Sequence, residues 1–127
     1  TAIVGFANSD IMFGEGLEET VHSLILAKKR RDWTDLFAVG VRKDIASVPS
    51  HLMPYDNPVD DETWVKFIEF AEANSKLYLD NSADYFLWNR DWSGYWIDQP
   101  PFVFGGAAFD NWIVGWTQTR KNTATIN

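Results

Sequence analysis

Two aspartates lie where a carboxylate could take part in chemistry. Asp10 ends an Asn-Ser-Asp turn that follows directly on the short apolar run Ala2–Ala7. Asp110 is the single charged residue in a long aromatic segment. Carboxylates beside Asn and Ser at the end of a strand suit a hard ion such as Mg²⁺ or Mn²⁺, which takes few protein ligands and completes its shell with water and substrate phosphates. The sequence therefore makes Asp10 the candidate metal ligand.

The segment before Asp110 adds a second candidate site. A short β-branched and aromatic run ends in Gly105 and Gly106, which let the backbone approach a ligand closely. A helix-forming run follows, and the free N–H groups at a helix start often bind anionic groups. Both aspartates also have simpler explanations: Asp110 as an N-cap or first-turn residue, and Asp10 as part of an ordinary turn. These alternatives stay open.

The composition excludes several other kinds of site. Two distant histidines and no cysteine cannot supply the usual zinc ligands, and no Walker loop, nucleophile elbow or Rossmann glycine fingerprint is present. A net charge of −7 argues against nucleic acid and anionic membranes as partners. No apolar run reaches the length of a membrane span, so we expect none.

The hydrophobic pattern predicts strands that alternate with helices, which favours one α/β layered domain over residues 1–127. In an open sheet of this class, ligands gather at the carboxyl ends of strands, where Asn8 and Asp10 would lie. The expected strands are Ala2–Ala7, Leu36–Val41 (both buried) and Asp84–Trp88. The first expected helix covers 15–31. The second begins at Asp60 or Asp61, and its inner face carries Trp64, Phe67, Ile68 and Ala71. The third runs through Phe109, Trp112, Ile113 and Trp116. Residues 46–59, 74–83 and 89–99 are expected to connect these elements, and the polar tail from Thr117 to fray.

Seven tryptophans make the chain rich in large aromatic side chains. Trp88, Trp92 and Trp96 recur at every fourth position around a polar loop, where exposed rings could serve as platforms for the apolar faces of sugars. This pattern supports an alternative function, a non-catalytic carbohydrate-binding or interaction module. Core packing explains each ring equally well.

Taken together in order, several short motifs resemble those of a known enzyme family. Phe6–Ile11 (FANSDI) is similar to the NxDI version of the DxD motif in glycosyltransferases of the GT-A type. The chain then shows an RxD motif at 42–44, DYF at 84–86, and PPFxxG followed by DNW over 100–112. The resemblance extends from Ala2 to about Trp116, and the DNW block is its most specific part.

The resemblance implies a GT-A fold, here a mixed sheet flanked by helices. It also implies Mn²⁺ or Mg²⁺ as cofactor, a nucleotide-diphosphate sugar as donor, and a glycan or other hydroxyl acceptor. The activity implied is transfer of a sugar from that donor to that acceptor.

By the same resemblance, particular positions take particular roles. Asp10 would bind the metal and through it the donor diphosphate, with Asn8 at the first Asp position of a full DxD motif. Asp110 would be the base that deprotonates the acceptor hydroxyl. The other substrate-binding positions are Arg42 toward the donor, Asp84 and Tyr85 of the DYF motif, Gly105 with Gly106 before the active-site helix, and Asn111 with Trp112 on the acceptor side.

The resemblance covers the part of a GT-A domain that carries the metal and acceptor sites. In GT-A enzymes the nucleotide base is bound by strands upstream of the DxD motif, so the resemblance implies that this chain is similar to the C-terminal half of such a domain. An open sheet edge could also pair with a second copy. We expect Asp10, Asp84, Gly105 and Asp110 to converge on one pocket, and placing Asp10 and Asp110 on opposite faces would contradict this.

Overall fold

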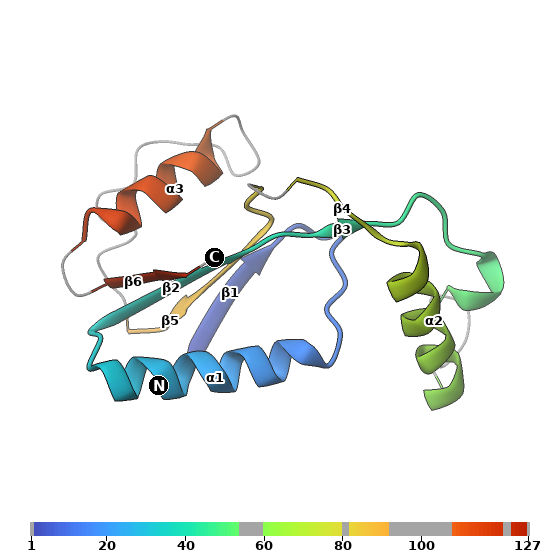
Figure 1. Ribbon diagram of the computed structural model, residues 1–127, viewed down its shortest axis with the longest axis horizontal. Helices are drawn as coiled ribbons and strands as arrows, with labels where there is room; N and C mark the ends of the chain where they lie inside the picture. The colour runs from blue at the N-terminus through green and yellow to red at the C-terminus, as the bar shows by residue number, and fades with distance from the viewer. Residues whose placement is uncertain (1, 54–59, 80–81, 92–107, 121–122, 127) are drawn as a thin grey trace.

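A four-stranded mixed sheet forms the centre of the computed structural model (Figure 1), which describes residues 2–53, 60–79, 82–91, 108–120 and 123–126. The strand order is β1-β5-β2-β6. β5 is antiparallel to both β1 and β2, and β6 is parallel to β2. The strands are β1 (Ile3–Ala7), β2 (Asp35–Gly40), β5 (Tyr85–Asn89) and β6 (Thr123–Ile126). The predicted α/β class is confirmed.

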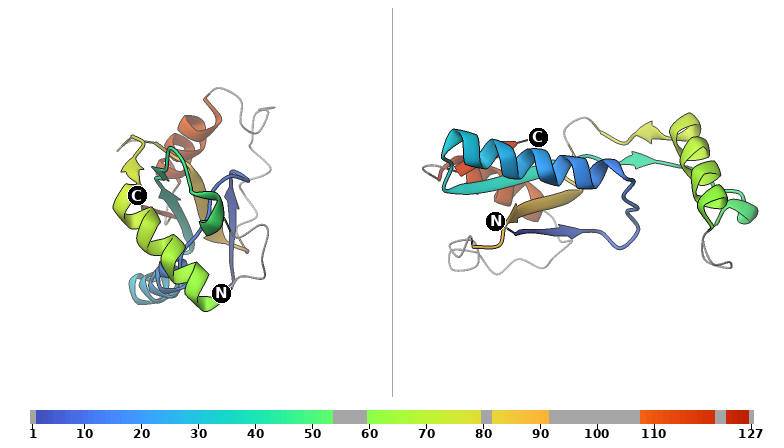
Figure 2. Two further views of the ribbon diagram at one scale, coloured as in Figure 1. Left: turned by 90° about the vertical axis from the view of Figure 1, so that its right-hand side faces the viewer. Right: turned by 90° about the horizontal axis from the view of Figure 1, so that it is seen from below.

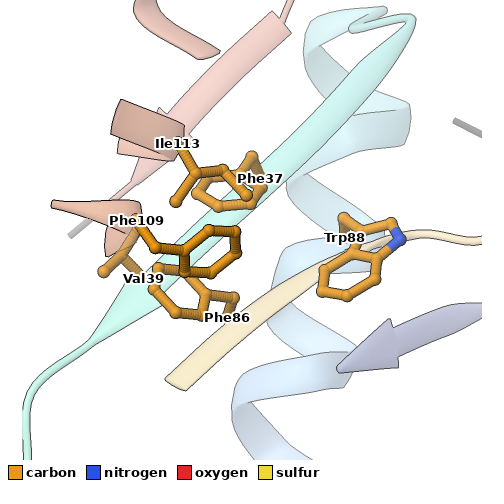
Figure 3. Close-up of a cluster of buried hydrophobic side chains, with 6 residues drawn as sticks. All are labelled: Phe37, Val39, Phe86, Trp88, Phe109 and Ile113. Carbon is orange, nitrogen blue, oxygen red and sulfur yellow. The ribbon is translucent and has the colours of Figure 1, made fainter. Parts of the chain in front are cut away.

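One helix covers each face of this sheet, α1 (Gly16–Arg31) and α3 (Phe109–Gln118). Because side chains alternate across a strand, β2 and β5 supply both layers of the core. On the α3 face, Phe37, Val39, Phe86 and Trp88 pack with Phe109 and Ile113, as Figure 3 shows. On the α1 face, Leu36, Ala38 and Leu87 pack with Leu24.

The helix α1 forms where the apolar spacing predicted it. Glu18 and Glu19 lie in its first turn and four basic residues lie in its last turn. These charges are opposite in sign to the nearby ends of the helix dipole and therefore stabilise the helix. Asp32 ends the helix in the left-handed conformation, with φ at 54° and its N–H bonded to the carbonyl oxygen of Lys28. Lys28 in turn donates its Nζ to the carbonyl oxygen of Trp33 at 2.9 Å, so part of the basic run fixes the helix end.

Residues 43–53 and 60–79, which we call the arm, project beyond one end of the sheet (Figures 1 and 2). A two-stranded ribbon forms its base, with β3 (Lys43–Asp44) antiparallel to β4 (Lys76–Leu77). A 3₁₀ turn, η1 (Ser50–Leu52), and the helix α2 (Asp61–Asn74) form the rest. α2 starts as predicted: Asp60 caps it, and the Oδ1 of Asp60 accepts from the N–H of Thr63 at 2.7 Å.

Three sequence predictions about the fold are wrong. The tail does not fray throughout, because Thr123–Ile126 forms β6 and satisfies the backbone groups along the outer edge of β2. β1 is half-buried instead of buried, because it lies at the edge of the sheet and has β5 on one side. Part of the expected connection 74–83 is the strand β4.

Candidate functional site

The sheet topology gathers most of the predicted site residues at one end of the sheet. β1 and β2 both run toward this end and β5 starts from it, since Tyr85 pairs with Ala7 on one side and with Gly40 on the other. Asn8 and Asp10 follow the end of β1, and Arg42 follows the end of β2. Segments far apart in the chain therefore meet at the end where ligands bind in open α/β sheets.

The first turn of α3 brings Asp110 to the same end. Phe109 starts the helix, and its ring lies 6.2 Å from that of Phe86, near the start of β5, in a nearly perpendicular contact (Figure 3). Asp110 is half-buried and lies in the first turn, while the N-cap position belongs to Ala108 at a φ of 71°. Of the two simple explanations for Asp110, the first-turn position holds.

Asp84 is a buried carboxylate that joins the ends of β2 and β5. Its backbone N–H donates to the carbonyl oxygen of Gly40 at 2.9 Å. Its Oδ2 accepts from the backbone N–H of Arg42 at 3.1 Å and from the hydroxyl of Ser82 at 2.5 Å, and its Oδ1 accepts from Nη1 of Arg42. A buried carboxylate is tolerated when it is paired and hydrogen-bonded in this way.

Arg42 holds several groups at once. Its Nε donates to Oδ1 of Asp44 at 2.8 Å, and its guanidinium carbon lies 4.0 Å from the centre of the Tyr78 ring. The hydrogen bond to Asp44, together with the nearby charge of Asp84, raises the pKa of Arg42 above its usual value. We call this set the Arg42 cluster; its members are Arg42, Asp44, Tyr78, Ser82 and Asp84.

The loop that carries Asp10 passes toward the α1 face. Asn8 and Asp10 are exposed, and the N–H of Ile11 closes a turn on the carbonyl oxygen of Asn8 at 3.2 Å. Phe13 then packs edge-on against Tyr85, with ring centres 5.2 Å apart. Asp10 and Asp110 thus share one end of the sheet: Asp10 lies in the exposed loop beyond the last residue of the edge strand β1, and Asp110 in the first turn of the helix that covers one face. That they line one pocket stays a prediction.

Tyr85 also covers the end of β2. A Cβ placed on Gly40 would come within 1.9 Å of the Tyr85 ring, so any larger residue at this position would displace that ring. The sequence marked Tyr85 as a substrate-binding residue, and the structure shows its ring packed on Phe13 and Gly40.

Of the remaining predicted substrate-binding residues, two lie on α3 and two fall outside the described part of the chain. Asn111 is exposed on α3, and Trp112 is half-buried and stacks on Trp116 at 5.7 Å. Gly105 and Gly106 lie outside the described residues.

The alternative function rests on three tryptophans, and for one of them the prediction is wrong. Trp88 is only 9% exposed, because its place in β5 turns it toward the core under α3 (Figure 3). Trp92 and Trp96 lie outside the described residues.

A metal site here would need few protein ligands. Among the residues that the structure describes, no group of three or more His, Asp or Glu side chains could hold a metal ion. Asp10 with the neighbouring Asn8 offers one carboxylate and one amide oxygen, both exposed. That donor set fits Mg²⁺ or Mn²⁺ shared with substrate phosphates, and it does not fit an ion held by protein alone.

Three residues of structural importance were not predicted from the sequence. Ser82 and Tyr78 complete the Arg42 cluster from a stretch expected to be only a connection. Asn89, expected in a loop, is buried at the end of β5, and its Oδ1 accepts from the N–H of Leu36 at 2.7 Å. An Asn directly after a run of strand residues was the only available indication.

Comparisons with known proteins give no family for this chain. No family model, no curated protein and no solved structure matches it. Among the described helices, none has both the length and the apolar character needed to cross a membrane.

Proposed function

We propose that this chain is part of a metal-dependent glycosyltransferase that moves a sugar from a nucleotide-diphosphate donor to a hydroxyl acceptor. One observation carries the proposal: the topology places Asp10, Asp84 and Asp110, up to 100 positions apart in the sequence, at one end of a single sheet. The motifs that resemble GT-A enzymes provide the remaining support.

Each residue has a role that its position supports. Asp10 and Asn8 lie on an exposed turn, where a divalent ion can reach them together with a diphosphate. The ion, when bound, would neutralise the charge of the leaving diphosphate. Asp110 is half-buried in the first turn of α3 and would take the proton from the acceptor hydroxyl. Asn111 and Trp112, next along the same helix, would contact the acceptor.

The edge of the sheet at β1 supports the proposal that this chain is one half of the domain. In the described part of the chain, β1 pairs only with β5. The nucleotide-binding strands that the GT-A resemblance implies before the NxDI motif would pair along this edge. Donor binding would then be weaker without that upstream part.

A thermal-shift titration with UDP and GDP, each with and without Mn²⁺, tests the proposal. A ligand that binds only the folded state stabilises it by about 2.7 kcal/mol at a hundredfold excess over Kd. We expect a shift that requires both the nucleotide and Mn²⁺ and that disappears in Asp10→Ala.

Asp91→Ala is the matched control. Asp91 is an exposed aspartate in the turn that follows β5, at the opposite end of the sheet from Asp10. Its variant should keep the full metal-dependent shift. Equal loss in both variants, or a shift that does not need the metal, would contradict the assignment of Asp10.

A further inference from the structure

The arm is joined to the sheet at the Arg42 cluster. The outgoing chain leaves β2 through Arg42, and the returning chain enters β5 through Asp84. These two residues are bonded twice, backbone N–H to carboxylate and guanidinium to carboxylate. The arm's own Tyr78 donates its N–H to the carbonyl oxygen of Arg42 at 3.2 Å and lies under its guanidinium.

Beyond this junction, the described arm packs mostly on itself. α2 packs against η1, and β3 pairs with β4. Figures 1 and 2 show α2 well beyond the end of the sheet. The side chain of Ile68 on α2 reaches back toward Gly14: its Cδ1 lies 4.0 Å from the point where a Cβ on Gly14 would stand. Gly14 belongs to the loop that carries Asp10.

The side chains near the junction bury little apolar surface. Leu77, Tyr78 and Leu79 are each about half exposed, as is Val65 on α2. Segments with few buried apolar contacts open locally at a lower free energy than the core. The bonds of the Arg42 cluster are therefore the principal described restraint at the base of the arm.

We propose that the Arg42 cluster is a conformational device that fixes the direction of the arm and, through Ile68, the position of the Asp10 loop. Arg42 is then a positioning residue, whose guanidinium bridges two carboxylates instead of reaching a ligand. When the bridge breaks, the arm opens as a unit while the sheet stays folded. This inference does not depend on the glycosyltransferase proposal, because it concerns only contacts within the chain.

Hydrogen–deuterium exchange followed by mass spectrometry tests this in the full chain. Arg42→Lys keeps the positive charge but cannot span Asp44 and Asp84 with a planar fork. We expect amide exchange over 43–53 and 60–79 to become at least about tenfold faster, and exchange over 11–15 to rise with it, because local opening sets these rates. Exchange in β2, β5, α1 and α3 should stay as in the parent chain.

Glu62→Gln is the matched control for loss of an ion pair. Glu62 pairs with Lys66 at 2.5 Å on the exposed surface of α2, and its variant should leave exchange unchanged over 11–15 and at β3 and β4. Faster exchange spread evenly through the chain in Arg42→Lys would overturn the proposal, since the cluster would then stabilise the whole fold. Unchanged exchange in the arm would overturn it as well.

Ile68→Ala tests whether the arm positions the Asp10 loop, and it leaves the Arg42 cluster intact. It removes the side chain that approaches Gly14, so exchange over 11–15 should rise while exchange at β3 and β4 stays the same. If exchange over 11–15 does not change, the arm does not position the Asp10 loop. This variant also keeps the proposal testable should Arg42→Lys fail to fold.

Discussion

The sheet and the arm are built on different principles. In the sheet, Leu36 and Phe37 are adjacent residues of β2, both completely buried, because helices cover both faces. In the arm, Leu77 of β4 is 49% exposed on a two-residue strand. The sheet is stabilised by burial of apolar surface on both faces, whereas the arm buries few apolar side chains, Leu52 and Phe67 among them, and depends also on a helix cap, a short ribbon and the Arg42 cluster. The same chain therefore contains a rigid unit and a weakly attached one.

This difference matters for the candidate site, which lies where the two regions meet. Asp110 comes from the rigid part, in a helix whose Phe109 and Ile113 are core residues. Asp10 comes from an exposed loop beside the arm. A base on a fixed helix and a metal ligand on a loop would allow the metal side of the site to adjust while the acceptor side stays in place.

The largest difference between the sheet and the arm is expected when a leucine in each region is replaced by alanine. Leu36→Ala removes a side chain with no exposed surface and should destabilise the fold by about 2–5 kcal/mol, through lost burial and the cavity left behind. Leu77→Ala makes the same chemical change in the arm and should cost less than about 0.5 kcal/mol. Urea denaturation followed by tryptophan fluorescence measures both. Similar losses would mean that the arm belongs to the same cooperative core.

A second pair of variants compares asparagines and should give a smaller effect. The backbone pairing of β2 with β5 ends at Phe37 and Trp88. Beyond that pair, Oδ1 of the Asn89 side chain accepts a hydrogen bond from the N–H of Leu36. Asn89→Ala leaves that N–H without this partner and should cost about 1–3 kcal/mol. Asn74→Ala removes an exposed side-chain bond to the carbonyl oxygen of Phe70 and should stay within about 0.5 kcal/mol. Equal midpoints in chemical denaturation would contradict this ranking.

The smallest expected effect is a pH response confined to the arm. The backbone N–H of Thr63 holds the pKa of Asp60 below its usual value. A carboxylate with a lowered folded-state pKa stabilises the fold above its unfolded pKa, about 3.9 for Asp. That stabilisation is lost as the pH falls through the lower, folded-state pKa. The Thr63 amide signal in NMR spectra should therefore shift below about pH 4, with the sheet signals unchanged.

Asp60→Asn is the control for this response, because Asn keeps a cap acceptor without a titrating group. Its Thr63 signal should not titrate. A titration that persists in this variant would assign the response to another carboxylate.

Much of the fold followed from local patterns in the sequence. The hydrophobic pattern over 15–31 predicted α1, and Asp60 was one of two candidate caps for α2. The runs at 36–41 and 84–88 predicted β2 and β5 to within a residue. These predictions succeed because helix periodicity, capping and buried strands depend on residues close together in the chain.

The site was predicted less completely, because its key contacts join distant residues. The RxD and DYF motifs were noted separately, and only the fold shows Arg42 and Asp84, 42 positions apart, in one ion pair. Trp88 was misjudged because its polar neighbours follow it in the loop, while its own position in β5 faces the core. Local polarity does not report which face of a strand a helix covers.

By itself the sequence determined the type and order of the main elements, the identity of the candidate carboxylates and the cap of α2, since each depends on side chains within about one or two helical turns. Only the tertiary structure decided the strand order, the burial of Trp88 and the pairing of β6 with β2. It also placed the arm next to the Asp10 loop. These features depend on which strand edges and apolar faces of the sheet other elements cover. That is decided by contacts between residues far apart in the chain, so it is a property of the whole sheet.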